Sequence, residues 1–131
     1  MKYDDFAQFV KERTRFRSDE DANRAISSVI ELLGQRISSS QAVDIAAALP
    51  PEVRPYLMQR VQTPEAEPFA LEKFLSAVGE RTGVDRAAAG EQARAVLSVV
   101  GEWLPREELR DTLAQLPNEM RGFFEWMKKA A

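Results

Sequence analysis

The sequence contains neither cysteine nor histidine. Without cysteine the chain cannot form disulfide bonds, thiolate metal sites or iron–sulfur clusters, and it has no thiol nucleophile. Without histidine it lacks the commonest general base and the commonest ligand of transition metals. Carboxylates are the only catalytic side chains in good supply. The sequence therefore indicates no catalytic residue and no cofactor, and it favours a binding role over an enzymatic one.

An excess of positive charge is also missing, because 18 Lys and Arg residues stand against 21 Asp and Glu residues, for a net charge of -3. Neutralisation of phosphates by Lys and Arg supplies most of the affinity of proteins for nucleic acid. Nucleic acid could therefore be bound only through a local basic patch.

Neither a secretory signal nor a membrane span is indicated by the sequence. The first residues, Met1 to Asp5, include two aspartates and are not followed by the apolar segment of a signal peptide. No apolar run approaches the roughly 20 residues that a membrane-spanning helix needs. We expect a cytoplasmic protein.

The chain contains an internal duplication. The segment from Leu49 to Leu57 returns as Leu116 to Phe124, with the same order of apolar, proline, acidic, basic and aromatic residues. Glu12-Arg13-Thr14 returns unchanged as Glu80-Arg81-Thr82. A unit of about 60 residues has therefore been duplicated. We predict a single domain over residues 1–131, with repeat one at 1–60, a connector at 61–68 and repeat two at 69–131.

Helical periodicity runs through both predicted repeats, since apolar residues recur three and four positions apart and runs of β-branched residues are missing. The predicted fold class is all-α, a compact bundle of about eight helices built from two pseudo-symmetric four-helix repeats, the eighth helix starting at Asn118. The apolar stripes of the first repeat are Tyr3, Phe6, Phe9 and Val10; Ala22, Ile26, Val29, Ile30 and Leu33; and Ala42, Ile45, Ala46 and Leu49. Those of the second are Leu71, Phe74, Leu75 and Val78; Ala93, Val96, Leu97, Val100 and Leu104; and Leu109, Leu113 and Leu116.

Capping residues indicate where several helices begin and end. Ser18, which three acidic residues follow, predicts the start of the second helix, and Ser38 with Gln41 has the form of a capping box for the third. Pro51 suits the first position of the fourth helix. Gly83 predicts a left-handed cap at the end of the fifth helix.

The segments around the two Leu-Pro corners resemble a known family. Ala46-Ala47-Ala48-Leu49-Pro50 and Ala114-Gln115-Leu116-Pro117 each follow an apolar core helix and precede an Arg-x-aromatic motif. This doubled pattern resembles the bacterial family called domain of unknown function 2267, over nearly the whole chain. The resemblance implies an all-α duplicated fold, and it brings no established activity, cofactor or catalytic residue.

Acidic residues cluster at two predicted helix starts, as Asp19-Glu20-Asp21 and as Glu107-Glu108 with Asp111. Clustered carboxylates could bind a divalent cation, as in a carboxylate-based metal-binding protein or enzyme. The helix dipole favours acidic residues at the same positions, and the spacing and central glycine of a calcium loop are missing. We favour the capping role and keep the metal site as an alternative.

Lys11, Arg13, Arg15 and Arg17 form the only local basic cluster of the sequence, with Phe16 among them. These side chains are possible contacts for an anion, and an aromatic ring beside them could stack on a base. Basic residues are also favoured in the last turn of a helix, where carbonyl groups are exposed. Weak nucleic-acid binding through this cluster is a further, less favoured alternative.

Several polar residues are kept in both predicted repeats, among them Asp44 with Asp111 and Arg54 with Arg121. Two such arginines could act as paired anion clamps. We favour a structural role, in which each arginine bridges an aspartate across the Leu-Pro corner and fixes the angle between the third and fourth helices.

The second predicted repeat carries Trp103, Trp126 and Met127 at positions where the first repeat has Arg or Gln. Aromatic residues and Met are enriched in interface cores. These side chains either seal the seam between the repeats or form an exposed patch for a partner. We predict a non-enzymatic protein–protein interaction module that binds a partner protein or a second copy of itself through Trp103, Trp126, Met127 and Phe124.

Overall fold

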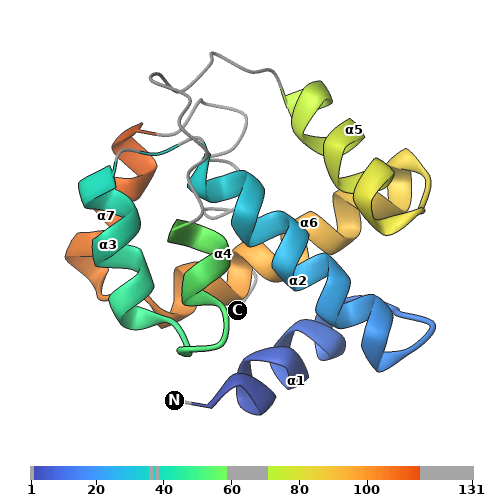
Figure 1. The fold of residues 1–131 in the computed structure, drawn as a ribbon, viewed down its shortest axis with the longest axis horizontal. Coiled ribbons are helices and arrows are strands. Elements are labelled where there is room, and N and C mark those ends of the chain that lie inside the picture. The colour runs from blue at the N-terminus through green and yellow to red at the C-terminus, as the bar shows by residue number, and fades with distance from the viewer. Residues whose placement is uncertain (1, 36, 38, 59–70, 116–131) are drawn as a thin grey trace.

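The computed structural model describes residues 2–35, 37, 39–58 and 71–115 (Figure 1). Within these ranges the chain forms seven α-helices and no β-strand, which confirms the predicted all-α class. The eighth helix, predicted from Asn118, and the predicted connector lie outside the described residues. The helices are α1 (Tyr3–Arg13), α2 (Asp19–Gly34), α3 (Ser39–Ala48), α4 (Arg54–Met58), α5 (Leu71–Thr82), α6 (Arg86–Trp103) and α7 (Arg106–Gln115).

Helix α2 is central to the arrangement, since it packs against α1, α4, α5 and α6. Figure 1 shows α2 crossing the middle of the molecule, with α5 toward one end and the adjacent helices α3 and α7 toward the other. Helix α1 also packs against α6. Helices from the first and second halves of the chain therefore share one hydrophobic core.

The core follows the apolar stripes predicted from the sequence. Each stripe residue of α2 is at most 1% exposed, and the same holds for Ala93, Val96, Leu97 and Val100 of α6. Burial of one such Ile, Leu or Val side chain contributes about 1.5–3 kcal/mol. These two helices supply the largest share of the core because their stripes face each other and their neighbours.

Local capping fixes the loops that join α1 to α2 and α5 to α6. Ser18 Oγ accepts a hydrogen bond from the Asp21 amide at 3.1 Å, which confirms the predicted start of α2. Gly83 has a φ of 75°, which confirms the predicted left-handed cap, and its amide donates to the Gly79 carbonyl at 2.8 Å. Asp85 caps α6 by accepting from the Ala88 amide at 2.9 Å.

The fourth helix begins later than the sequence predicts. Pro51 was the expected first position, but residues 51–53 form a turn and α4 starts at Arg54. Pro55 lies in the first turn of α4, where its missing amide hydrogen leaves no helical hydrogen bond unmade. The expected capping box of the third helix includes Ser38, which lies outside the described residues.

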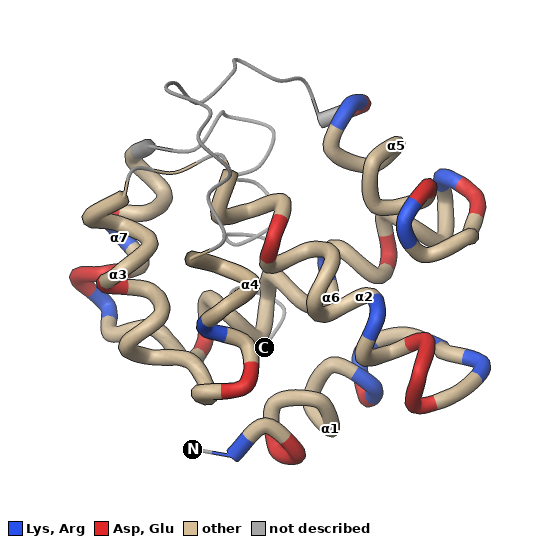
Figure 2. The backbone as a smooth tube through the Cα atoms, viewed as in Figure 1, with Lys and Arg blue, Asp and Glu red and all other residues tan. Residues whose placement is uncertain are grey.

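Charges of both signs are distributed over the described part of the molecule, where Lys and Arg are interspersed with Asp and Glu (Figure 2). The helices that the structure describes are all too short or too polar to cross a membrane.

Candidate functional site

Three aromatic rings in edge-to-face contact extend from the core to the surface between α1 and α6. The ring of the fully buried Phe6 meets Trp103 edge-on, with centroids 5.1 Å apart and an interplanar angle of 88°. Trp103 meets Phe9 in the same manner at 6.2 Å and 81°. Trp103 is partly buried against the core, whereas Phe9 is 42% exposed. The predicted stripe placed Phe9 in the core, but Phe6 and Val10 occupy the core-facing side of α1 and leave Phe9 at its edge.

Acidic side chains flank the exposed ring. Asp5 lies one helical turn before Phe9 and Glu12 lies one turn after it, and both are exposed. We call Phe9, Trp103, Asp5 and Glu12 together the Phe9 surface. It combines a supported apolar ring with a negative rim.

Ion pairs divide the predicted basic cluster into two parts. Lys11 Nζ lies 3.1 Å from Asp19 Oδ1, and Arg13 pairs with Glu102 while donating to Ser98 Oγ at 2.7 Å. Arg15 and Arg17 lie in the exposed loop between α1 and α2, and the described residues offer neither of them an ion pair. Two of the four predicted anion contacts are therefore engaged within the fold.

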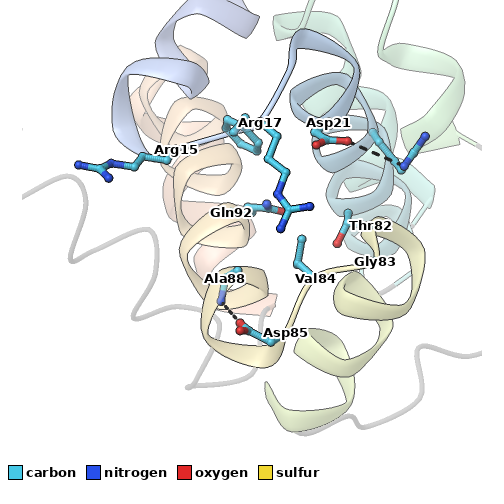
Figure 3. A pocket seen from close by; sticks show the side chains of 11 residues that line it. Arg15, Arg17, Asp21, Thr82, Gly83, Val84, Asp85, Ala88 and Gln92 are labelled. Atoms are coloured by element: carbon cyan, nitrogen blue, oxygen red, sulfur yellow. Dashed lines mark hydrogen bonds and ion pairs between the residues drawn. The ribbon is translucent and has the colours of Figure 1, made fainter.

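A pocket of about 460 Å³ lies between the α1–α2 loop and the α5–α6 loop. We call it the loop pocket. Figure 3 shows the Arg17 side chain extending across it between Gln92 and Thr82, whereas Arg15 points away. The pocket is lined by Arg15, Phe16 and Arg17 from the first loop, Asp21 and Arg24 from α2, Thr82, Gly83, Val84 and Asp85 around the second loop, and Ala88 and Gln92 from α6.

Most polar groups of the loop pocket already have partners. Thr82 Oγ1 donates to the Val78 carbonyl at 2.7 Å, and Asp85 caps α6. Asp21 lies 4.0 Å from Arg24. Gln92 differs, because it is only 6% exposed and its Oε1 accepts no hydrogen bond from any residue that the structure describes.

The first acidic cluster lies in the first turn of α2 and takes part in local ion pairs. Asp19 pairs with Lys11 and Asp21 with Arg24. No group of three or more Asp and Glu side chains in the described ranges is arranged to hold a metal ion. Contact between α3 and α7 brings Asp44 close enough to affect Glu108, which shares α7 with Glu107 and Asp111. Partial burial, and then the charges of Asp44, Asp111 and Glu107, raise the pKa of Glu108 above its ordinary value.

Arg54 donates hydrogen bonds to carbonyl groups at the Leu-Pro corner. Its Nε donates to the carbonyls of Ala46 at 2.9 Å and Leu49 at 3.1 Å. The ion pairs of the described residues do not include the expected Asp44–Arg54 bridge. Arg54 therefore provides a hydrogen-bond donor to carbonyl groups at the C-terminal end of α3, where the helix dipole favours a cation.

Residues 3–123 match the sequence model of a protein family, DUF2267, whose description is 'uncharacterized conserved protein'. The chain belongs to this family. The match confirms the resemblance indicated by the two Leu-Pro corners. No curated protein matches the sequence.

Of the four predicted partner-binding residues of this DUF2267 protein, the structure describes only Trp103. Trp103 is half-buried and lies between the buried Phe6 and the exposed Phe9. Trp126, Met127 and Phe124 lie outside the described residues, as does Arg121 of the second corner.

Two residues that matter to the described sites of this DUF2267 protein were not singled out from the sequence. Phe9 was assigned to the core because it is one position from Val10 and three from Phe6. Gln92 is three residues after Ala89 and four before Val96, a spacing that already places it on the buried face of a helix. A polar residue on such a face is a signal that sequence reasoning could have used.

Proposed function

We propose that this chain is a non-enzymatic protein–protein interaction module that contacts its partner through the Phe9 surface. The observation that carries the proposal is the exposed Phe9 ring, held edge-on against Trp103, which itself stands on the buried Phe6. The side chain loses little conformational freedom on binding because its support is already in place. Aromatic residues, Phe among them, are enriched in the cores of protein interfaces.

The rim of the Phe9 surface suggests the chemistry of the partner. Asp5 and Glu12 are exposed on the same side of α1 as Phe9, and the structure shows no basic side chain paired with either of them among the described residues. A complementary partner would offer an apolar pocket bordered by Lys or Arg. We propose a cytoplasmic setting for this interaction, in keeping with the absence of cysteine.

Site-specific photocrosslinking tests this proposal. A benzophenone amino acid replaces Phe9 in one variant and Val43, which is 54% exposed on α3, in a control variant. After irradiation in cells of the source organism, we expect one defined protein adduct from position 9 that is absent from position 43. Equal adducts from both positions would contradict the proposal, and an adduct with a second copy of the chain would make the surface a homodimer interface instead.

A further inference from the structure

We infer that the loop pocket binds a small organic anion of the size of a nucleoside monophosphate, with Arg17 pairing with the phosphate and the Gln92 amide contacting the edge of the base. This inference is independent of the Phe9 surface, because the two sites share no residue. It concerns a binding site and requires no chemical step.

Arg17 supplies the cation. Its side chain crosses the pocket, and no carboxylate among the described residues pairs with it (Figure 3). Of the other two arginines that line the pocket, Arg24 lies 4.0 Å from Asp21 and Arg15 points away, so Arg17 is the cation directed into it. Arginine binds phosphate through parallel hydrogen bonds from its planar guanidinium group.

Gln92 supplies the second, independent indication of a ligand. It comes from α6 rather than from either loop, it is 6% exposed, and its Oε1 lacks a partner among the described residues. A buried amide oxygen without a hydrogen-bond partner lowers stability, and a role in ligand binding would explain why it is kept. The terminal amide carries a donor and an acceptor side by side and can rotate, so it complements the donor–acceptor edge of a nucleobase.

The remaining features favour a mononucleotide over a nucleic-acid strand. Phe16, which packs against the core, also lines the pocket and supplies an aromatic side chain of the kind on which bases stack. A volume of about 460 Å³ lies within the usual range for small-molecule sites. Asp21 and Asp85 border the same pocket, and their charges would repel the successive phosphates of a strand.

Titration calorimetry with AMP, GMP, inorganic phosphate and a single-stranded oligonucleotide, on the native chain and three variants, tests the inference. Arg17→Gln removes the free cation, and Gln92→Leu removes the amide while keeping a similar volume. Arg15→Gln is the matched control, since it removes the same charge from the same loop but from a side chain that points away. The unfolding midpoint of each variant verifies that it remains folded.

We expect at least one of the two nucleotides to bind the native chain, and Arg17→Gln to weaken that binding about tenfold or more, as expected for loss of a charge-assisted hydrogen bond. Gln92→Leu should weaken nucleotide binding and leave the weaker binding of phosphate unchanged, while Arg15→Gln should change neither. The inference is overturned if neither nucleotide binds, or if Arg15→Gln and Arg17→Gln have equal effects. Tighter binding of a single-stranded oligonucleotide, weakened equally by both arginine variants, would assign the loop to nucleic acid instead.

Discussion

Arg13 of α1 pairs with Glu102 of α6, 89 residues further along the chain, and donates to Ser98 Oγ on the same helix. Arg81 of α5 lies 3.1 Å from Glu31 of α2. The two arginines stand at corresponding positions of the predicted repeats, and each reaches a helix of the other predicted repeat. Because these pairs cross between the halves, they help to hold the halves as one unit.

Loss of the Arg13 side chain should therefore weaken the whole fold. Arg13→Met is expected to lower the free energy of unfolding by about 1–2 kcal/mol, because it removes a charge-assisted hydrogen bond to the buried Ser98. Lys11→Met is the matched control, since the Asp19 side chain of its ion pair is 84% exposed and the loss should stay within about 0.5 kcal/mol. Urea denaturation measures the free energy of unfolding of both variants. Equal losses of stability would contradict a stabilising role for the Arg13 contacts beyond that of an exposed ion pair.

Gly34 should tolerate no side chain, because α4 passes directly over it. A Cβ atom at this position would lie 2.3 Å from the Leu57 carbonyl oxygen, which belongs to the backbone and cannot rotate away. Gly34→Ala is expected to lower the free energy of unfolding by about 1–3 kcal/mol as α2 and α4 are forced apart.

Gly90 offers the opposite case on α6. The nearest atom to an added Cβ there is Leu75 Cδ1 at 3.9 Å, an ordinary contact. Gly90→Ala should raise the free energy of unfolding by about 0.5–1 kcal/mol, because alanine loses less backbone entropy in a helix. Thermal denaturation of the two variants should move the midpoint in opposite directions, and a shift of the same sign in both would contradict the packing described for α2 and α4.

Glu108 should make stability depend on pH. Its pKa is raised in the folded state above the ordinary value of 4.5, so the folded protein favours the protonated side chain. The resulting stabilisation is complete below pH 4.5 and is lost as the pH rises through the folded-state pKa. Glu108→Gln is expected to raise the melting temperature at neutral pH and to leave it nearly unchanged at about pH 3. A variant that is no more stable at neutral pH than the native protein would refute this role for the Asp44, Asp111 and Glu107 charges.

The features predicted well from sequence are those that depend on neighbouring residues. Ser18 caps the helix that it precedes, Gly83 adopts the left-handed conformation where the helix ends, and the stripe of α2 is buried as its spacing requires. The hydrogen-bond acceptors of Arg54 are backbone carbonyl groups and not the predicted aspartate. Every helix end has such carbonyl groups, so the sequence does not show which of them an arginine will contact. A charged partner such as Asp44 is visible in the sequence and was chosen for that reason.

The candidate sites depend on contacts between distant segments, which the sequence does not display. Periodicity places Phe9 near the core but cannot decide which side of α1 faces α6, so its exposure emerges only from the packing of Trp103. The loop pocket likewise requires two loops that are far apart in the sequence to lie side by side. Gly83 and Val84 stand in the second predicted repeat where Arg15 and Phe16 stand in the first, yet these four residues line one pocket.

The central claim, that Phe9 anchors a protein partner, is tested most directly by affinity once the crosslinked protein has been identified. The dissociation constant of that partner is measured for the native chain, for Phe9→Ser and for the control Val43→Ser, all with matched unfolding midpoints. We predict that Phe9→Ser raises the dissociation constant about tenfold or more, as for a residue at the centre of an interface, and that Val43→Ser leaves it nearly unchanged. A change of less than about twofold for Phe9→Ser, or equal losses in both variants, would contradict the account.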